Sequence, residues 1–151
     1  MSAGSSSSSS AGSAPASPRV QPPVTEGAED FWEATRERRY VLQWCLDCEQ
    51  PVSYPRVVCP GCLGTRLEFR LASGRGTVYA VTVEHRPQNP AMKALAPYAV
   101  VLVDLDEGVR VVSNVVDCDP ADVTVGLPVE VTWEPLDDGR NLPLFRPATP
   151  G

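Results

Sequence analysis

From residue 67 onward the chain consists of short hydrophobic runs separated by turn-forming residues. The runs are rich in valine, tyrosine and threonine, so they predict β-strands at residues 67–71, 77–85, 98–105, 109–116 and 128–135. In the second run, strict alternation would place Tyr79, Val81, Val83 and His85 on one face and the even-numbered residues from Val78 to Glu84 on the other.

The connections between these runs carry turn signals. "DLDEGV" predicts a tight hairpin with Gly108 at positive φ, and "DDG" at 137–139 predicts another before the strand-like "LPLFRP". "DPADV" at 119–123 predicts one helical turn capped by Asp119. With the longer irregular stretch "RPQNPAMKALAP", the pattern predicts a small barrel of the oligonucleotide/oligosaccharide-binding (OB) type; an open sandwich is the alternative.

A short helix is predicted ahead of the strands, at residues 28–39, "AEDFWEATRERR". Its first turn is acidic and its last turn is basic, the order that the helix dipole favours. Ala28, Phe31, Trp32 and Thr35 fall on one face, which must be buried against this domain or against a partner. The next residues, "YVLQW" at 40–44, predict a strand that leads into Cys45.

Residues 1–27 are mostly serine, glycine, alanine and proline, so we expect a disordered leader or linker. The segment has no apolar signal-peptide core, and no run in the chain is long enough to span a bilayer, so a cytoplasmic protein is predicted. The formal net charge is −6. This charge disfavours nucleic-acid binding, because neutralising phosphates with basic residues supplies much of that affinity.

Two Cys-x-x-Cys pairs stand ten residues apart in "CLDCEQPVSYPRVVCPGC", at residues 45–62. Disulfides would require an oxidising compartment, and thioredoxin-like redox chemistry would require a βαβ setting that the pattern lacks. Two facing turns of this kind can instead converge four thiolates on a metal ion, zinc ahead of iron. With Cys45, Cys48, Cys59 and Cys62 as ligands, no coordination position stays open, so the ion would be structural.

The remaining reactive residues do not form a catalytic site. Glu84 and the only histidine, His85, should point to opposite faces of their strand, and no serine has the strand–turn–helix setting of a nucleophile elbow. "SGRG" at 73–76 is a turn that could also let Arg75 approach a diphosphate. Cys118 lies between two aspartates that disfavour its thiolate, so we interpret it as a packed or idle side chain.

The order of these motifs resembles a known family. The helix "FWEATRERRYVLQ", the ribbon "CLDC…CPGC", the segment "SGRGTVYAVTVEHRP" and the later strands together are similar to the zinc-ribbon/OB-fold family of thiolase-associated, acyl-CoA-linked proteins, long labelled a domain of unknown function. The resemblance implies a mainly β fold, with an N-terminal helix at 28–40, a rubredoxin-like zinc ribbon at 41–68, an OB barrel at 69–147 and a tail at 148–151.

The family also implies partners. Its members are companions of thiolase-fold enzymes: of acetoacetyl-CoA thiolase and hydroxymethylglutaryl-CoA synthase in archaea, and of lipid-transfer-protein-type aldolases of steroid side-chain breakdown in actinobacteria. The actinobacterial members of the family are often fused behind a hydratase domain, which would suit the serine-rich leader. By resemblance, the zinc ligands are the four cysteines named above.

Two further sets of residues are nominated on the same ground. Arg75, His85 and Arg86, near the junction of ribbon and barrel, are candidates for acyl-CoA contact. For the partner surface we nominate four large apolar residues, since aromatic anchors usually dominate interfaces; the alternative is that they pack the domain's own core. They are Phe31, Trp32, Leu144 and Phe145.

Three hypotheses of function follow. The first is a non-catalytic subunit that binds and organises a thiolase-like acyl-CoA enzyme, most simply the steroid side-chain aldolase, in a symmetric two-plus-two assembly. The second is a single-stranded nucleic-acid binder that stacks bases on Tyr79 and Tyr98, which the acidic charge disfavours. The third is a free-standing acyl-CoA-binding protein.

Overall fold

The computed structural model describes residues 21–148, so the predicted leader lies largely outside the described residues. Within that range no helix is long and apolar enough to cross a membrane. The elements in chain order are α2 (Glu29–Thr35), β1 (Val41–Cys45), β2 (Pro51–Val52), β3 (Leu67–Leu71), β4 (Arg75–Glu84), the 3₁₀ helix η1 (Pro90–Leu95), β5 (Tyr98–Leu105), β6 (Arg110–Val115), the 3₁₀ helix η2 (Pro120–Asp122), β7 (Pro128–Pro135) and β8 (Asn141–Pro147).

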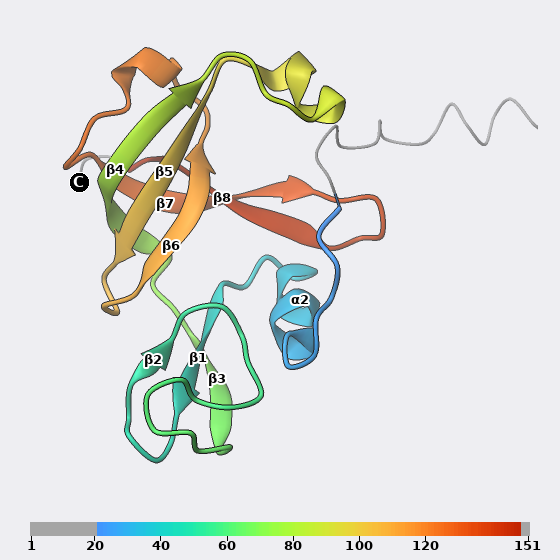
Figure 1. Cartoon of the computed structure of the whole chain (residues 1–151), viewed down its shortest axis with the longest axis vertical. Coiled ribbons are helices and arrows are strands. Elements are labelled where there is room, and N and C mark those ends of the chain that lie inside the picture. The colour runs from blue at the N-terminus through green and yellow to red at the C-terminus, as the bar shows by residue number, and fades with distance from the viewer. Residues whose placement is uncertain (1–20, 149–151) are drawn as a thin grey trace, which may run out of the picture.

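The last five strands close into a barrel in the order β4-β5-β6-β8-β7. Neighbouring strands are antiparallel except β6 and β8, which meet in parallel at the pair Val115 and Phe145. This five-stranded barrel is of the OB type, as predicted, and the sandwich alternative is wrong. Figure 1 shows the barrel above and the ribbon strands β1, β2 and β3 below, with α2 beside the β7–β8 hairpin.

The predicted alternation along β4 is wrong, because the strand contains a bulge. Val78 pairs with Val103 and Ala80 pairs with Leu102, so Tyr79 is an extra residue without a partner on β5. Beyond the bulge the inward face changes from even to odd positions, and Val81 packs on the barrel core as Val78 does. Such bulges bend a strand, which a small closed barrel requires.

The barrel core is formed mainly by valine side chains and one phenylalanine. On β5 the pattern alternates strictly, with Ala99, Val101, Val103 and Leu105 buried. Phe145 lies among them and is 1% exposed. The β-branched residues that predicted the strands are therefore the same residues that fill the barrel.

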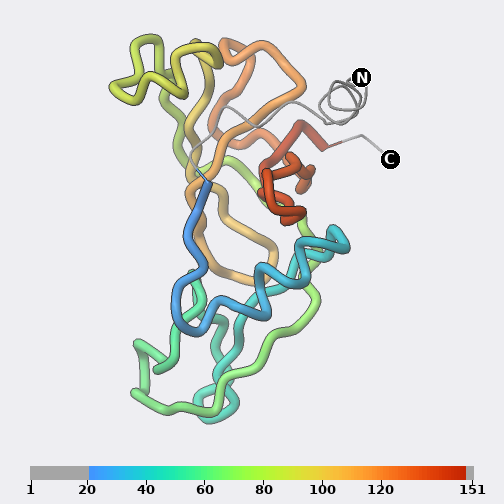
Figure 2. Tube along the Cα trace, turned by 90° about the vertical axis from the view of Figure 1, so that its right-hand side faces the viewer, coloured from blue at the N-terminus to red at the C-terminus, as the bar shows by residue number. Residues whose placement is uncertain are grey.

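Helix α2 is shorter than predicted and ends at Thr35. The chain then turns through Arg38, which has a positive φ of 57°, and enters β1 by way of Tyr40. The ribbon sheet has the order β2-β1-β3, and its two ends meet where the Ala72 N–H donates to the Tyr40 carbonyl at 2.9 Å. The ribbon is thus an insertion between α2 and β4 that leaves and rejoins the rest of the chain at neighbouring points, as the tube in Figure 2 also shows.

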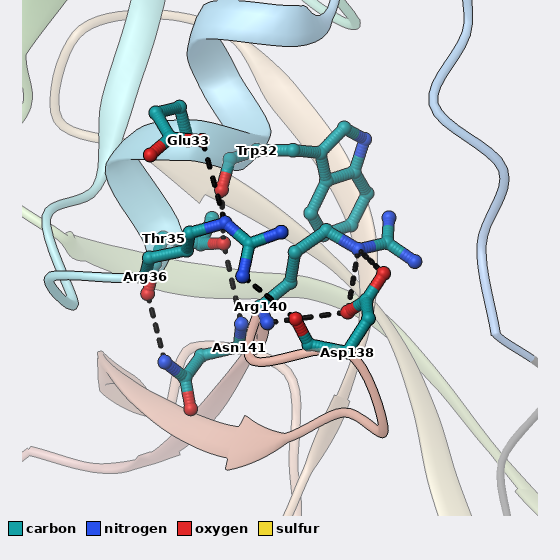
Figure 3. Close-up of polar contacts among 7 residues, drawn as sticks. All are labelled: Trp32, Glu33, Thr35, Arg36, Asp138, Arg140 and Asn141. Carbon is teal, nitrogen blue, oxygen red and sulfur yellow. Dashed lines mark hydrogen bonds and ion pairs between the residues drawn. The ribbon is translucent and has the colours of Figure 1, made fainter.

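A polar clamp fixes α2 to the β7–β8 hairpin (Figure 3). The Asn141 side-chain amide donates to the Thr35 carbonyl at 2.8 Å, and the Asn141 backbone N–H donates to Thr35 Oγ1 at 3.2 Å. Arg36 donates to the Asp138 carbonyl at 2.7 Å. Thr35 and Asn141 are both buried and cannot hydrogen-bond to water. The two bonds between them therefore satisfy polar groups that would otherwise have no partner.

The same hairpin places a buried cation against the helix. The Arg140 guanidinium lies 4.8 Å from the centre of the Trp32 ring and donates to the Asp138 carboxylate. The hydrogen bond from Arg140 lowers the pKa of Asp138. A cation over an indole face in this way adds attraction to the packing of helix on barrel.

Candidate functional site

The four predicted cysteine ligands converge in the ribbon. Cys45 ends β1, and the other three lie in the two turns that flank the sheet. Their Sγ atoms all lie within 4.8 Å of one another, with 3.5 Å between Cys45 and Cys62 and 3.7 Å between Cys48 and Cys59. None of them forms a disulfide. The prediction that they form one cluster able to hold a metal is confirmed.

The two cysteine turns have the same backbone geometry. In the first, the Glu49 N–H donates to the Cys45 carbonyl at 2.9 Å, and in the second the Leu63 N–H donates to the Cys59 carbonyl at 2.9 Å. Glu49 and Leu63 both adopt positive φ, 56° and 65°. Both turns therefore form without a glycine in this position, each at the modest cost of one left-handed residue.

Backbone amides are directed at the sulfurs of the second turn. The Gly61 N–H donates to Cys59 Sγ at 3.3 Å and the Gly64 N–H donates to Cys62 Sγ at 3.4 Å. Backbone hydrogen bonds, from Cys62 first and then Gly61, lower the pKa of Cys59 to about 7. A side chain at Gly64 would meet the Asp47 carboxylate, which would then have to move away from this turn. Such donors favour the thiolate, the form that binds a metal.

This donor set fits a tetrahedral ion. Four sulfurs at about 2.3 Å from a zinc ion stand about 3.8 Å from one another, close to the 3.5 Å and 3.7 Å between the two sulfur pairs. The hydrophobic support is small, since the buried cluster of the ribbon contains only Cys45, Val52 and Cys59, with Cys48 and Leu67 packed on it. If these cysteines hold a metal ion, the ribbon would depend on that ion to fold, because its buried core consists largely of the cysteines themselves.

The ribbon is tied to the open edge of strand β6. The Val112 N–H donates to the Tyr54 hydroxyl at 3.0 Å, and the Ser53 hydroxyl donates to the Arg110 carbonyl at 3.2 Å. Tyr54 was not singled out from the sequence, and no spacing or composition marks it. It is recognisable only once β6 is known to be paired with β8 at one residue alone.

A cavity of about 290 Å³ lies where α2, the ribbon and the barrel meet, and we call it the junction cavity. Phe31 and Trp32 of α2 line one side of it. Both are half-buried, and Phe31 also packs against the core. The remaining walls come from the segment before α2, from β1 and the loop after β2, and from β6 and β8: Pro23, Thr25, Ala28, Tyr40, Val41, Leu42, Gln43, Val52, Tyr54, Pro55, Val111, Val112, Ser113, Leu142, Pro143 and Phe145.

For the other two nominated interface residues the core alternative holds. Leu144 is 4% exposed and Phe145 is 1% exposed, and Phe145 belongs to the barrel core. Their strand β8 closes the barrel between β6 and β7, so both side chains pack inside the domain. They are removed from the candidate partner surface.

The nominated acyl-CoA residues do not form one site. Arg75 begins β4 at the ribbon junction, whereas His85 and Arg86 follow its other end, so the ten-residue strand separates them by roughly 30 Å. Arg75 pairs with Glu130 at 3.5 Å, and Glu130 also pairs with Arg146 at 3.0 Å. The prediction that all three residues lie near the junction is wrong for His85 and Arg86.

Tyr79 and Cys118 were also considered from the sequence. The bulged Tyr79 is 50% exposed, but the Arg110 guanidinium lies 3.4 Å from the centre of its ring and occupies one face. Burial, followed by nearby aspartates, raises the pKa of Cys118. Since Cys118 is half-buried against the barrel core, its interpretation as a packed side chain is consistent with the structure.

Comparisons with known proteins identify the family. The family model described as "ChsH2, C-terminal OB-fold domain" matches residues 69–134. The solved "Ltp2-ChsH2(DUF35) aldolase" contains a chain that is 36% identical, with a TM-score of 0.75, and the match covers 85% of this chain and 100% of that one.

Two curated relatives agree. A "DUF35 domain-containing scaffold protein" of Methanocaldococcus jannaschii is 33% identical over 114 residues, 72% of this chain and 80% of that protein. A "Probable enoyl-CoA hydratase alpha subunit" of Thermomonospora curvata is 37% identical over 132 residues, 87% of this chain but only 41% of that protein's length. With its cysteine ribbon, its OB barrel and these relatives, the chain belongs to the DUF35 family.

Proposed function

We propose that this chain is a non-catalytic accessory subunit or domain that binds and organises a thiolase-like acyl-CoA enzyme. The observation that carries the proposal is its likeness, over the full length of the matched chain, to the DUF35 component of an aldolase. The scaffold name of the archaeal relative supports the same role. In this role the reacting groups belong to the partner, and this chain supplies a surface.

The aldolase of steroid side-chain degradation is the partner that we favour, in a two-plus-two assembly in the cytoplasm. The solved relative is named as an aldolase, and a symmetric pair of accessory chains suits a dimeric enzyme. The hydratase name of the Thermomonospora curvata relative, of which this chain covers 41%, supports an association with a hydratase domain. A reducing compartment also keeps the four cysteines available for a metal.

We assign Zn²⁺ to Cys45, Cys48, Cys59 and Cys62, whose separations and amide donors suit it. When bound, the ion neutralises the thiolates and links the two turns, so its part is structural. For acyl-CoA, Arg75 is the residue at the ribbon junction, where its guanidinium is exposed beside Arg146. His85 and Arg86 are retained as a separate candidate contact.

Co-expression tests this function. The thiolase-like enzymes of the source genome are each co-expressed with the chain, purified through a tag on one component and sized by light scattering. A stable hetero-oligomer with aldolase activity that is missing from either component alone is the expected result. Absence of a complex with every candidate, or thioester turnover by the isolated chain, would rule the proposal out.

A further inference from the structure

The four clustered thiols of the ribbon are also a place where the chain can be oxidised, and their exposure is unequal. Cys45 and Cys59 are buried, Cys48 is half-buried and Cys62 is exposed. The fifth cysteine, Cys118, is half-buried and lies outside the cluster. Oxidation of cysteines follows their exposure, because the oxidant must reach the sulfur. Cys62 is therefore the sulfur of the cluster that a dissolved peroxide reaches first.

The sulfur beside Cys62 belongs to the other cysteine turn. Cys45 Sγ lies 3.5 Å from Cys62 Sγ, and Cys48 Sγ lies 3.7 Å from Cys59 Sγ. Both of these contacts cross from the first turn to the second. A buried thiol in contact with an exposed one is shielded from the oxidant and is placed to attack its neighbour once that neighbour is oxidised.

Backbone pairing holds the contact between the turns in place. Cys45 pairs with Leu67 in the register of β1 and β3, and the Leu46 N–H donates to the Arg66 carbonyl at 2.8 Å. The Arg66 guanidinium also pairs with the Asp47 carboxylate. Groups other than the thiols thus bond the first turn to the segment that follows the second. These bonds keep the two sulfurs adjacent while one of them is being oxidised.

We propose that Cys62 and Cys45 form a peroxide-sensitive pair, in which a disulfide replaces the metal ion as the link between the two turns. Counted from the thiols, the Cys62 sulfur attacks a peroxide oxygen, the O–O bond breaks, and a sulfenic acid and one water form. Cys45 Sγ then attacks Cys62 Sγ, the S–O bond breaks, and the disulfide and a second water form. One hydrogen peroxide is thus reduced as two thiols are oxidised.

The disulfide changes what holds the ribbon together. It removes two of the four ligands, and Cys48 and Cys59 alone do not hold the ion tightly. The ribbon stays closed nevertheless, because the new bond constrains the chain between residues 45 and 62. A dithiol reductant restores both thiols and is itself oxidised to a disulfide. This reversible oxidation rests on the metal assignment and not on the accessory role.

Graded hydrogen peroxide added to the purified, metal-loaded chain tests the pair. A dimedone-type probe, which reacts with sulfenic acids, should label Cys62 ahead of every other cysteine. Peptide mapping by mass spectrometry without reductant should then find the bond between Cys45 and Cys62 as the first disulfide. A chromogenic chelator should detect about one equivalent of released metal per disulfide, and dithiothreitol should reverse the oxidation.

Two variants and one comparison of states give the test its controls. Cys118→Ser removes the cysteine outside the cluster and should change the rate of metal release by less than about twofold, whereas Cys62→Ser should slow it at least about tenfold. Because C62S can also weaken metal binding or folding, the wild-type chain supplies a further measurement. Amide exchange across residues 43–69 should be at least about tenfold slower in the oxidised, metal-free chain than in the reduced chain treated with a chelator.

The outcomes are distinct. A first disulfide inside one turn, or a sulfenic acid trapped first at another cysteine, overturns the pair. If the oxidised ribbon exchanges as fast as the chelated one, the disulfide does not replace the metal as a link. A chain that purifies without metal overturns both the metal assignment and the exchange of metal for disulfide. None of these results bears on the accessory role, which co-expression tests separately.

Discussion

In the barrel thirteen buried residues form one hydrophobic cluster, whereas the buried cluster of the ribbon contains only Cys45, Val52 and Cys59. The barrel is stabilised by removing valine and phenylalanine side chains from water. Two of the three buried ribbon residues are candidate metal ligands. Hydrophobic burial alone therefore contributes little to the stability of the ribbon. If a metal ion links the ribbon cysteines as proposed, the two regions are stabilised by different means and should unfold under different conditions.

The buried cluster of the barrel and the buried cluster of the ribbon meet within strand β1. Leu42 of β1 belongs to the barrel cluster, while Cys45 of the same strand belongs to the ribbon cluster. Strand β1 therefore connects the core of the barrel directly to the cysteine cluster. Loss of metal should release the far part of the ribbon and leave the start of β1 in place.

Metal removal should have the largest effect. A strong chelator is expected to unfold residues 43–69 while the barrel strands keep their structure, because the ribbon has no other core. Amide hydrogen exchange read by mass spectrometry measures both regions in one experiment. Metal analysis well below one equivalent per chain, or a ribbon that stays protected after chelation, contradicts the assignment.

Phe145→Ala should produce the converse result. The 1% exposed ring fills the barrel, and its removal should lower the free energy of unfolding by about 3–5 kcal/mol. Denaturant titration measures this loss, and zinc stoichiometry measured in parallel should be unchanged. If the variant loses its metal while the barrel is still folded, the two regions are not separately stabilised.

Asn141→Ala should loosen α2 alone. It removes the 2.8 Å bond to the Thr35 carbonyl and leaves that buried group without its donor, at a cost of about 1–3 kcal/mol. Asn89→Ala, which removes an exposed cap on η1, is the matched control. Hydrogen exchange across residues 29–35 should increase in the first variant and stay at the wild-type rate in the second.

The smallest effect is expected at the surface of the barrel. The hydrogen bond from Arg110 lowers the pKa of Asp104 below its ordinary value. This pair therefore stabilises the fold at pH values above about 4, and its contribution is lost as the pH falls through the lowered pKa. Asp104→Asn should lower Tm at pH 7 by no more than about 2 °C and by less at pH 3, since exposed ion pairs contribute little. An equal change at both pH values would assign the effect to packing instead.

The ribbon could be predicted more completely than the barrel. Two Cys-x-x-Cys pairs ten residues apart leave few alternatives, because four thiols so placed can converge by local turns. The barrel strands followed from residue type, but the bulge at Tyr79 did not. Nothing in "TVYAVTVEH" marks an extra residue, since the curvature of a closed barrel, not the strand's own sequence, determines where the bulge falls.

Two errors in the candidate sites have different physical origins. Leu144 and Phe145 were ambiguous because a buried residue and an interface anchor are the same residue types. The separation of Arg75 from His85 could have been found, since ten extended residues span roughly 30 Å. The junction cavity depends on how three separate elements pack, and local sequence patterns carry no such information.

The hydrogen bond between Ala72 and Tyr40 holds together the two points at which the chain enters and leaves the ribbon. Leu42 and Arg70 face each other directly across β1 and β3, close enough for a two-residue turn to join them. Everything from residue 43 to residue 69 could then be exchanged for such a turn, or for the ribbon of another relative, without cutting any barrel strand. The cysteine-bearing part of the chain can therefore be varied while the strands of the barrel are left unaltered.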